Sequence, residues 1–185
     1  KGMSQYGAKG RSQSGQNYKD ILKAYFGKEP SNKDTGGQIS VSGYGNLDFE
    51  NYYLMGIAEM PSSFPKEALK AQAVAARTYA YRYKSGGQTI CTTQSCQVFS
   101  KSKADSPPGE WKSAVEETKG QVLDDTVGYY SSTTGGYITT MGWDTKCGNQ
   151  GCWTGDAYEK IGNSPWFYKG WYTQDYFNNS AKCSR

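Results

Sequence analysis

Apolar residues recur every three to four positions in several stretches of the chain, a spacing that predicts amphipathic helices. We expect one helix within residues 15–28, where Tyr18, Ile21, Leu22 and Tyr25 share a face and Gly27 ends the helix. Three more are expected over residues 48–60, from Pro65 to about Lys84, and over residues 110–119. Asp48 is the expected N-cap of the second helix, and Pro61 prevents its continuation.

Strands are predicted where apolar and polar residues alternate, in QISVSGYG, QVFSKS, QVLDD, VGYYSS and GYITTMGW. Gly135 and Gly136 form the expected turn between the last two, and residues 30–37 read as a linker. Because helices and strands alternate without a regular βαβ rhythm, we predict an α+β fold. We expect a single domain, with or without a small lobe, in which several helices pack on a mixed or antiparallel sheet beside a cleft.

The helix expected after Pro65 has alanine, leucine, valine or tyrosine around nearly its whole circumference, which indicates that it is mostly buried. Its polar residues Gln72 and Arg77 must therefore find partners. Two interpretations of Arg77 are equally open, a structural ion pair with an acidic residue or a role in a functional site.

Glu59 falls in the last turn of the helix expected over residues 48–60. The negative end of the helix dipole and the neighbouring apolar residues Met55, Met60 and Phe64 would both raise the pKa of its carboxyl group. A raised pKa is what a general acid near neutral pH requires. The plainer alternative is a solvated glutamate on the flank of a helix.

Two further stretches lack a core pattern. YYSSTTGG is rich in hydroxyl groups and ends in a glycine pair, which suits a tight exposed loop that a ligand can approach closely. GMSQYGAKG, near the N-terminus, is polar and flanked by glycines, and its composition predicts no structure.

The composition excludes several classes of enzyme and of binding partner. Histidine is absent, which excludes Ser-His-Asp and Cys-His nucleophiles and the H-E-x-x-H zinc proteases. The net charge of +4 is too small to indicate nucleic acid, but it favours an anionic polymer such as cell-wall glycan. Sixteen tyrosines suit a surface that binds sugars, although ordinary packing also explains them. With no run of 18 apolar residues, we expect no membrane span.

The five cysteines fall as two close pairs, Cys91 with Cys96 and Cys147 with Cys152, and a lone Cys183. Two small-loop disulfides would place the protein in an oxidising, extracytoplasmic compartment. The alternative is a zinc site with four cysteine ligands, although such sites more often use tighter C-x-x-C spacing. From its abrupt start and stop, we also expect the chain to be a fragment of a longer protein.

Residues 53–81, YLMGIAEMPSSFPKEALKAQAVAARTYAY, resemble the stage II sporulation protein D family, which includes the amidase-enhancer proteins. TTQSCQVF, AVEETKGQVL, YYSSTTGGY and NSPWFYKGW support the resemblance, as does KGMSQYGAKGRSQSGQNYKDILKAYFG at the N-terminus. It covers most of residues 1–170. We therefore expect one family domain over residues 1–185, composed of the M-S-Q-Y-G-A segment with its helix (1–29), a catalytic core (38–171) and a tail (172–185).

This sequence departs from the family in two ways. The M-S-Q-Y-G-A segment follows the catalytic region in the sporulation members and precedes it here, as if it reached the same place from the other end. Some members bind zinc through cysteines and histidines near TTQSCQVF. The chain has no histidine, so we expect no such metal site and no cofactor.

The resemblance implies a peptidoglycan lytic transglycosylase that acts on the glycan strand with Glu59 as its single acid and base. The expected substrate contacts are Gln5, Tyr6, Gln72, Arg77, Ser131, Ser132, Gly135 and Gly136. One alternative is a wall-binding module without catalysis that enhances a separate cell-wall amidase. A third hypothesis is a zinc-stabilised interaction domain built on the paired cysteines.

Overall fold

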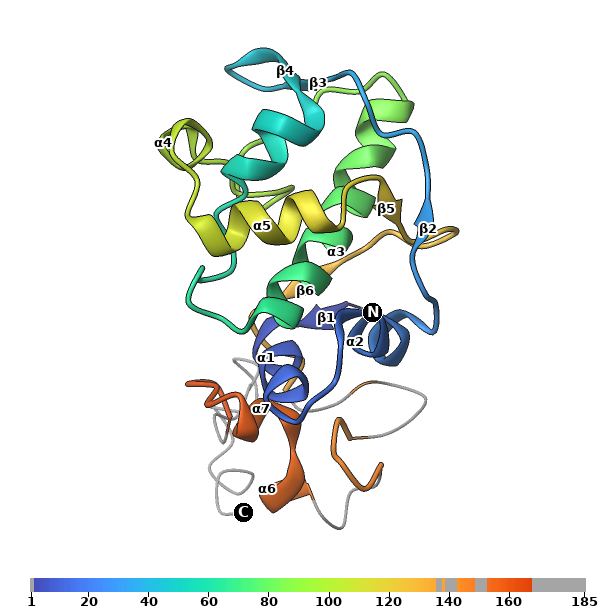
Figure 1. Ribbon diagram of the computed structural model, residues 1–185, viewed down its shortest axis with the longest axis vertical. Helices are drawn as coiled ribbons and strands as arrows, with labels where there is room; N and C mark the ends of the chain where they lie inside the picture. The colour runs from blue at the N-terminus through green and yellow to red at the C-terminus, as the bar shows by residue number, and fades with distance from the viewer. Residues whose placement is uncertain (1, 136–137, 139–142, 149–152, 168–185) are drawn as a thin grey trace, which may run out of the picture.

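The structure is a computed structural model, which describes residues 2–135, 138, 143–148 and 153–167 (Figure 1). Helices and short strands mix within one domain, which confirms the expected α+β class. The longest helix, α3, runs through the upper half of Figure 1 and α5 crosses it, while the two N-terminal helices lie beneath them. The α-helices are α1 (Gln5–Gln13), α2 (Tyr18–Phe26), α3 (Lys66–Ser85), α4 (Lys101–Asp105), α5 (Gly109–Glu117), α6 (Trp153–Asp156) and α7 (Tyr158–Ile161).

Helix α3 is the predicted alanine-rich helix. Its alanines are buried on all sides because α1, α2 and α5 pack against it, and small side chains permit that close approach. Gln72 and Arg77 are fully buried with them, as the pattern indicated. The helix ends at Gly86, whose backbone N–H donates to the carbonyl of Arg82 at 3.0 Å. This helix is the centre of the hydrophobic core.

Helix α2 is also confirmed, and its ends explain its bounds. The Asn17 side chain accepts from the backbone N–H groups of Lys19 and Asp20, and the Asp20 carboxylate accepts from the Asn17 N–H. These reciprocal bonds form a capping box. Gly27 ends the helix in the left-handed region with a φ of 71°.

The N-terminal segment, for which composition predicted no structure, forms helix α1. Ser4 caps it by accepting from the Gly7 N–H at 3.0 Å. Its glycines permit a close approach to α7: a Cβ added to Gly10 would lie 1.8 Å from the carbonyl oxygen of Tyr158. The small residues of this segment are therefore a packing surface rather than a loop.

The strands pair two by two, so the expected sheet is divided into three short ladders among the described residues. β3 and β4 form an antiparallel hairpin, β2 and β5 are also antiparallel, and β1 runs parallel to β6. The strands are β1 (Met3–Ser4), β2 (Ser31–Asn32), β3 (Gln38–Val41), β4 (Gly45–Asp48), β5 (Gln121–Val122) and β6 (Tyr130–Ser131). The parallel pair brings the N-terminal segment next to the hydroxyl-rich stretch.

The prediction of one helix over residues 48–60 is wrong for the second half of that range. Asp48 does cap a helical segment, accepting from the Asn51 N–H at 2.7 Å. That segment is a single π-helical turn (Phe49–Tyr53) followed by a 3-10 turn (Leu54–Gly56). The chain is then extended, because Ile57 pairs with Phe99 and the Ala58 N–H donates to the Val98 carbonyl at 2.9 Å. Tertiary pairing thus overrides the helical pattern before Glu59.

The later elements follow the prediction in part. The helix predicted over 110–119 is α5, and QVLDD and VGYYSS contain β5 and β6. QVFSKS is not a regular strand: Phe99 makes one bridge, and Ser100 then caps α4 by accepting from the Lys103 N–H. Gly135 has a φ of 70°, as a turn requires. Most of GYITTMGW, including Gly136, lies outside the described residues.

Candidate active site

Glu59 lies three residues beyond the 3-10 turn, at a bend that directly follows the residues paired with the chain around Val98. The expectation that a helix C-terminus acts on this carboxyl group is therefore wrong. Its pKa is nevertheless raised, because the half-buried side chain loses hydration. Hydrogen bonds from the Tyr130 hydroxyl and the Val98 backbone oppose this effect and are outweighed. The predicted direction of the shift is right, and burial causes it.

The direct side-chain partner of Glu59 is Tyr130 in β6, whose hydroxyl donates a hydrogen bond to Oε2. Sequence reasoning missed this residue, although it stands in the YYSSTTGG stretch. Two adjacent tyrosines gave no indication of which ring would turn inward. The structure resolves this, since Tyr129 is 53% exposed whereas the Tyr130 hydroxyl lies between Glu59 and Gln97.

Glu59 opens onto a pocket of about 470 Å³. Three of the predicted substrate contacts line it, namely Gln5, Ser131 and Ser132. The other lining residues are Ala58, Gln94, Val98 and Tyr130. Among the described lining residues, Glu59 is the one carboxylate and no cation is present. The site therefore offers a single acid with uncharged polar neighbours.

Gln72 does not line this pocket but supports a residue that does. The Gln5 side-chain amide donates from Nε2 to Oε1 of Gln72 at 3.4 Å. Gln72 is fully buried in α3, and its own Nε2 has no hydrogen-bond partner among the residues that the structure describes. The predicted pair is thus brought together, with Gln5 at the surface of the pocket and Gln72 behind it.

The pocket continues over the hydroxyl-rich loop. Ser131 and Ser132 also line a second hollow of about 470 Å³, together with Thr133, Thr134, Gly135 and Trp166. Because the two hollows share these serines, they lie next to each other, and we refer to them together as the groove. Tyr6 is outside both sets of lining residues and packs edge-on against Phe64 at 5.3 Å between ring centroids. The structure therefore places this predicted contact in side-chain packing rather than in the pocket lining.

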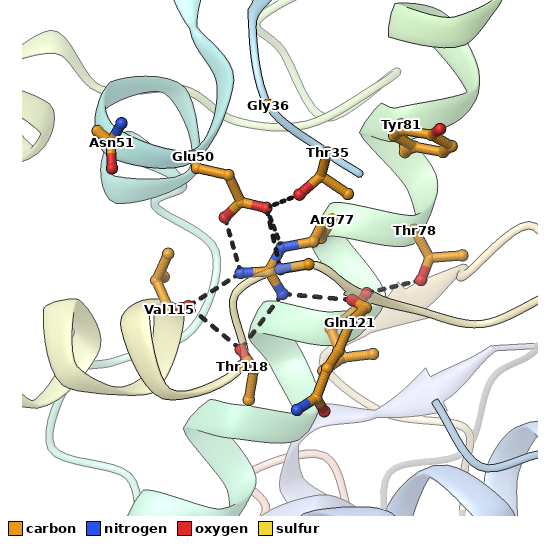
Figure 2. Close-up of polar contacts among 12 residues, drawn as sticks. Thr35, Gly36, Glu50, Asn51, Arg77, Thr78, Tyr81, Val115, Thr118 and Gln121 are labelled. Carbon is orange, nitrogen blue, oxygen red and sulfur yellow. Dashed lines mark hydrogen bonds and ion pairs between the residues drawn. The ribbon is translucent and has the colours of Figure 1, made fainter. Parts of the chain in front are cut away.

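Arg77 belongs to a structural brace, which decides between the two interpretations left open by the sequence. Its guanidinium donates from Nε and Nη2 to both carboxylate oxygens of Glu50, at 2.8 and 3.1 Å (Figure 2). Further bonds reach the hydroxyl of Thr118 and the carbonyl of Val115. Glu50 is only 4% exposed and also accepts from Thr35. The network ties α3 to α5 and to the turn at Phe49–Tyr53, away from the pocket lining.

Glu159 anchors the loop that forms the far wall of the groove. This fully buried carboxylate in α7 accepts from the hydroxyls of Ser4 and Thr133 and from the backbone N–H of Thr134 at 2.7 Å. The bonds join β1, α7 and the hydroxyl-rich loop at one point. Sequence reasoning missed Glu159, because nothing in its local pattern distinguishes it from a surface glutamate of a short helix.

The cysteine prediction is confirmed for its first pair. Cys91 and Cys96 form a disulfide, so the alternative of a zinc site with four cysteine ligands is wrong. Cys147 is also disulfide-bonded. Its expected partner Cys152 and the lone Cys183 lie outside the described residues. The Cys91–Cys96 loop carries Gln94, so the disulfide fixes part of the pocket wall.

Within the described residues, no group of three or more acidic, cysteine or histidine side chains is placed to hold a metal ion.

Comparison with known proteins places the central part of the chain in a family. Residues 40–124 match the family model described as "Stage II sporulation protein". A Bacillus subtilis (strain 168) protein named "Amidase enhancer" is 43% identical over 83 residues, which are 43% of this chain and 11% of that protein. This region belongs to the stage II sporulation protein family. The family resemblance predicted from the motifs is therefore confirmed. No solved structure matches the chain.

The stage II sporulation protein region supplies only part of the pocket. Ala58, Glu59, Gln94 and Val98 lie inside the matched residues 40–124. Gln5, Tyr130, Ser131 and Ser132 come from outside them. The candidate acid and the groups that face it therefore come from different parts of the chain.

In the described part of the chain, no helix is long and apolar enough to cross a membrane.

Proposed function

We propose that this protein is a lytic transglycosylase that cleaves the glycan strand of peptidoglycan with Glu59 as its acid and base. The observation that carries the proposal is the half-buried carboxyl group with a raised pKa, facing a polar groove as the one carboxylate of the described lining. Ordinary glycosidases use a pair of carboxylates, one as acid and one as base or nucleophile. A site with a single carboxyl group suits a reaction whose nucleophile belongs to the substrate itself.

The chemistry requires one proton donor that later becomes an acceptor. Protonated Glu59 gives its proton to the glycosidic oxygen as the bond from that oxygen to C1 breaks, which leaves an oxocarbenium-like sugar. The sugar's own 6-hydroxyl then attacks C1 and returns its proton to the Glu59 carboxylate. The products are a new sugar hydroxyl and a 1,6-anhydro ring, and the enzyme regains its starting state.

The groove supports this assignment beyond Glu59. Gln5, Ser131 and Ser132 offer amide and hydroxyl groups to the hydroxyls of a saccharide, and the groove runs on past Gly135 to the partly exposed ring of Trp166. Such polar groups around an aromatic ring are typical of sites that bind sugars. The net charge of +4 favours an anionic polymer, and the Cys91–Cys96 disulfide favours an oxidising, extracytoplasmic compartment.

The test uses purified glycan strands and mass spectrometry of the released products. Wild-type protein is expected to produce 1,6-anhydro ends, whereas Glu59→Gln, which keeps the shape and removes the acid, should lose at least about a thousandfold in rate. Glu29→Gln is the matched control, since Glu29 is exposed and, within the described part of the chain, forms its ion pair with the exposed Lys23. Full activity of Glu59→Gln would refute the assignment.

The second candidate function is a wall-binding module that enhances a separate amidase, and the printed name of the Bacillus subtilis relative favours it. A module of this kind would bind glycan strands and stimulate an added cell-wall amidase, yet wild-type protein would produce no anhydro ends. The same mass spectrometry therefore separates the two functions.

A further inference from the structure

A chain of hydrogen bonds leads from the core to Glu59. The Tyr53 hydroxyl donates to Oε1 of Gln97 at 3.0 Å, and Nε2 of Gln97 donates to the Tyr130 hydroxyl at 2.9 Å. The Tyr130 hydroxyl in turn donates to Oε2 of Glu59. Gln97 is fully buried, so this is a polar path through the protein interior rather than a surface contact.

The orientation of the Gln97 side-chain amide is fixed by the backbone carbonyl of Ala76. Nε2 also donates to the backbone carbonyl of Ala76 in α3, at 3.1 Å, and a carbonyl oxygen can only accept. Turning the amide over would place its oxygen against that carbonyl and leave a buried acceptor without a donor, which is costly. The second Nε2 proton must therefore point at the Tyr130 oxygen.

The direction of this bond determines what Tyr130 can do. Its oxygen accepts from Gln97, so its single proton is available for one acceptor, and Oε2 of Glu59 is that acceptor. Burial and the nearby Glu59 charge raise the pKa of Tyr130 well above its ordinary value, so the hydroxyl stays protonated. If Glu59 carried its proton on Oε2, two O–H groups would face each other. Tyr130 can therefore act only as a donor to Glu59.

We propose that Gln97 is a positioning residue of the reaction, which acts through Tyr130 to keep the proton of Glu59 on Oε1. This inference rests on the proposed role of Glu59 as the acid and base. A single oxygen atom then gives the proton to the glycosidic oxygen and later takes it from the 6-hydroxyl. Substrate must therefore present both groups, in turn, to Oε1.

Charged groups near Glu59 do not offer another explanation for a change in its pKa when Gln97 is replaced. The described residues that line its pocket are otherwise uncharged. Among the described residues, the titratable groups near it are Tyr130 and, deeper in the core, Tyr53. Burial and the Glu59 charge raise the pKa of both hydroxyls. The Val98 backbone supplies the remaining hydrogen bond. A change in the pKa of Glu59 on substitution of Gln97 would therefore pass through Tyr130.

The experiment measures the pKa of Glu59 directly, by NMR titration of carboxyl carbons labelled in the glutamates, with Glu59→Gln used to assign the signal. Tyr130→Phe should raise that pKa by about one unit, because a hydrogen bond to the charged carboxylate is lost. Gln97→Leu should raise it by about half as much, since the Tyr130 hydroxyl is then free to accept from a protonated Glu59. Tyr129→Phe, which changes an exposed ring beside Tyr130, is the control and should leave it unchanged.

The double variant decides the role of Gln97. If Gln97 acts through Tyr130, Gln97→Leu should cause no further shift when Tyr130 is already phenylalanine. An equal shift in both backgrounds, or an unchanged pKa in Tyr130→Phe, would overturn the proposal. Thermal melts confirm that each variant is folded at the temperature of the titration. The titration does not depend on turnover. A failure of the proposed positioning role of Gln97 is therefore distinguishable from a failure of the proposed function, which the product analysis of Glu59→Gln reports.

Discussion

The region that matches the family, residues 40–124, and the segments that flank it are held together in different ways. The matched region is built around α3, whose alanines pack closely in a continuous apolar core. Its buried ion pair, Arg77 with Glu50, has both charges satisfied within the matched residues. It supplies the candidate acid, Glu59, and the proposed positioning residue, Gln97.

The flanking segments pack through small residues and polar anchors. Helix α1 meets α7 at glycines, and Glu159 ties β1 and the hydroxyl-rich loop to α7. A second buried ion pair, Arg11 with Asp144, joins α1 to the chain before α6. These segments place Gln5, Tyr130 and the two serines opposite Glu59. The acid therefore comes from the closely packed matched region, whereas half of its pocket depends on separately anchored flanks.

The largest expected effect on stability lies in the matched region. Arg77→Met leaves the Glu50 carboxylate buried without its partner, which should lower the free energy of unfolding by about 3–5 kcal/mol. Chemical denaturation measures it, and Arg82→Met in the exposed part of the same helix is the control, with a change within about 0.5 kcal/mol. Glycan cleavage by the protein that remains folded should persist, because Arg77 does not line the pocket. Loss of activity in fully folded Arg77→Met would show that the brace also shapes the site.

A smaller effect on stability, with a larger effect on activity, is expected in the flanks. Glu159→Gln turns an N–H₂ group toward hydroxyl and backbone donors, and should cost about 2 kcal/mol because bonds to a charged acceptor are lost. The loop over Ser131 and Ser132 should loosen, so we expect KM for glycan strands to rise about tenfold. Glu116→Gln, at an exposed ion pair in α5, is the matched control. An unchanged KM would mean that the matched region alone holds the substrate.

The smallest expected effect is the pH dependence of stability that arises from Glu59. Its pKa in the folded protein is above the ordinary value of 4.5, so between these two values the folded chain keeps a proton that the unfolded chain has lost. The contribution of Glu59 to the free energy of unfolding is therefore fully present at low pH, and it is lost as the pH rises through the pKa of Glu59 in the folded protein. Glu59→Gln should melt about 1–3 °C above wild type at pH 7 and at the same temperature at pH 4. A difference in Tm that is equal at both pH values would contradict burial as the cause.

The parts of the fold that were predictable depend on residues close together in sequence. Helix α2 was predictable because its apolar face and Gly27 lie within one short stretch. The position of Glu59 was not, because an extended pairing with Val98, about forty residues on, replaced the helix that its own neighbours favour. Gln97 carried one usable signal: it precedes Phe99 by two positions in a predicted strand, so both face inward, and a buried glutamine needs partners.

The sequence by itself determined the alanine helix, the family of the central region and Glu59 as the candidate acid, and it left the first cysteine pair open between a disulfide and a zinc site. Only the tertiary structure decided that Arg77 braces the core, that Tyr130 and Gln97 stand behind Glu59, and that Glu159 holds the facing loop. The physical reason is separation along the chain. Tyr130 meets Glu59 across 71 residues, and Ser4 meets Glu159 across 155, so these contacts arise from packing and leave no trace in the local periodicity.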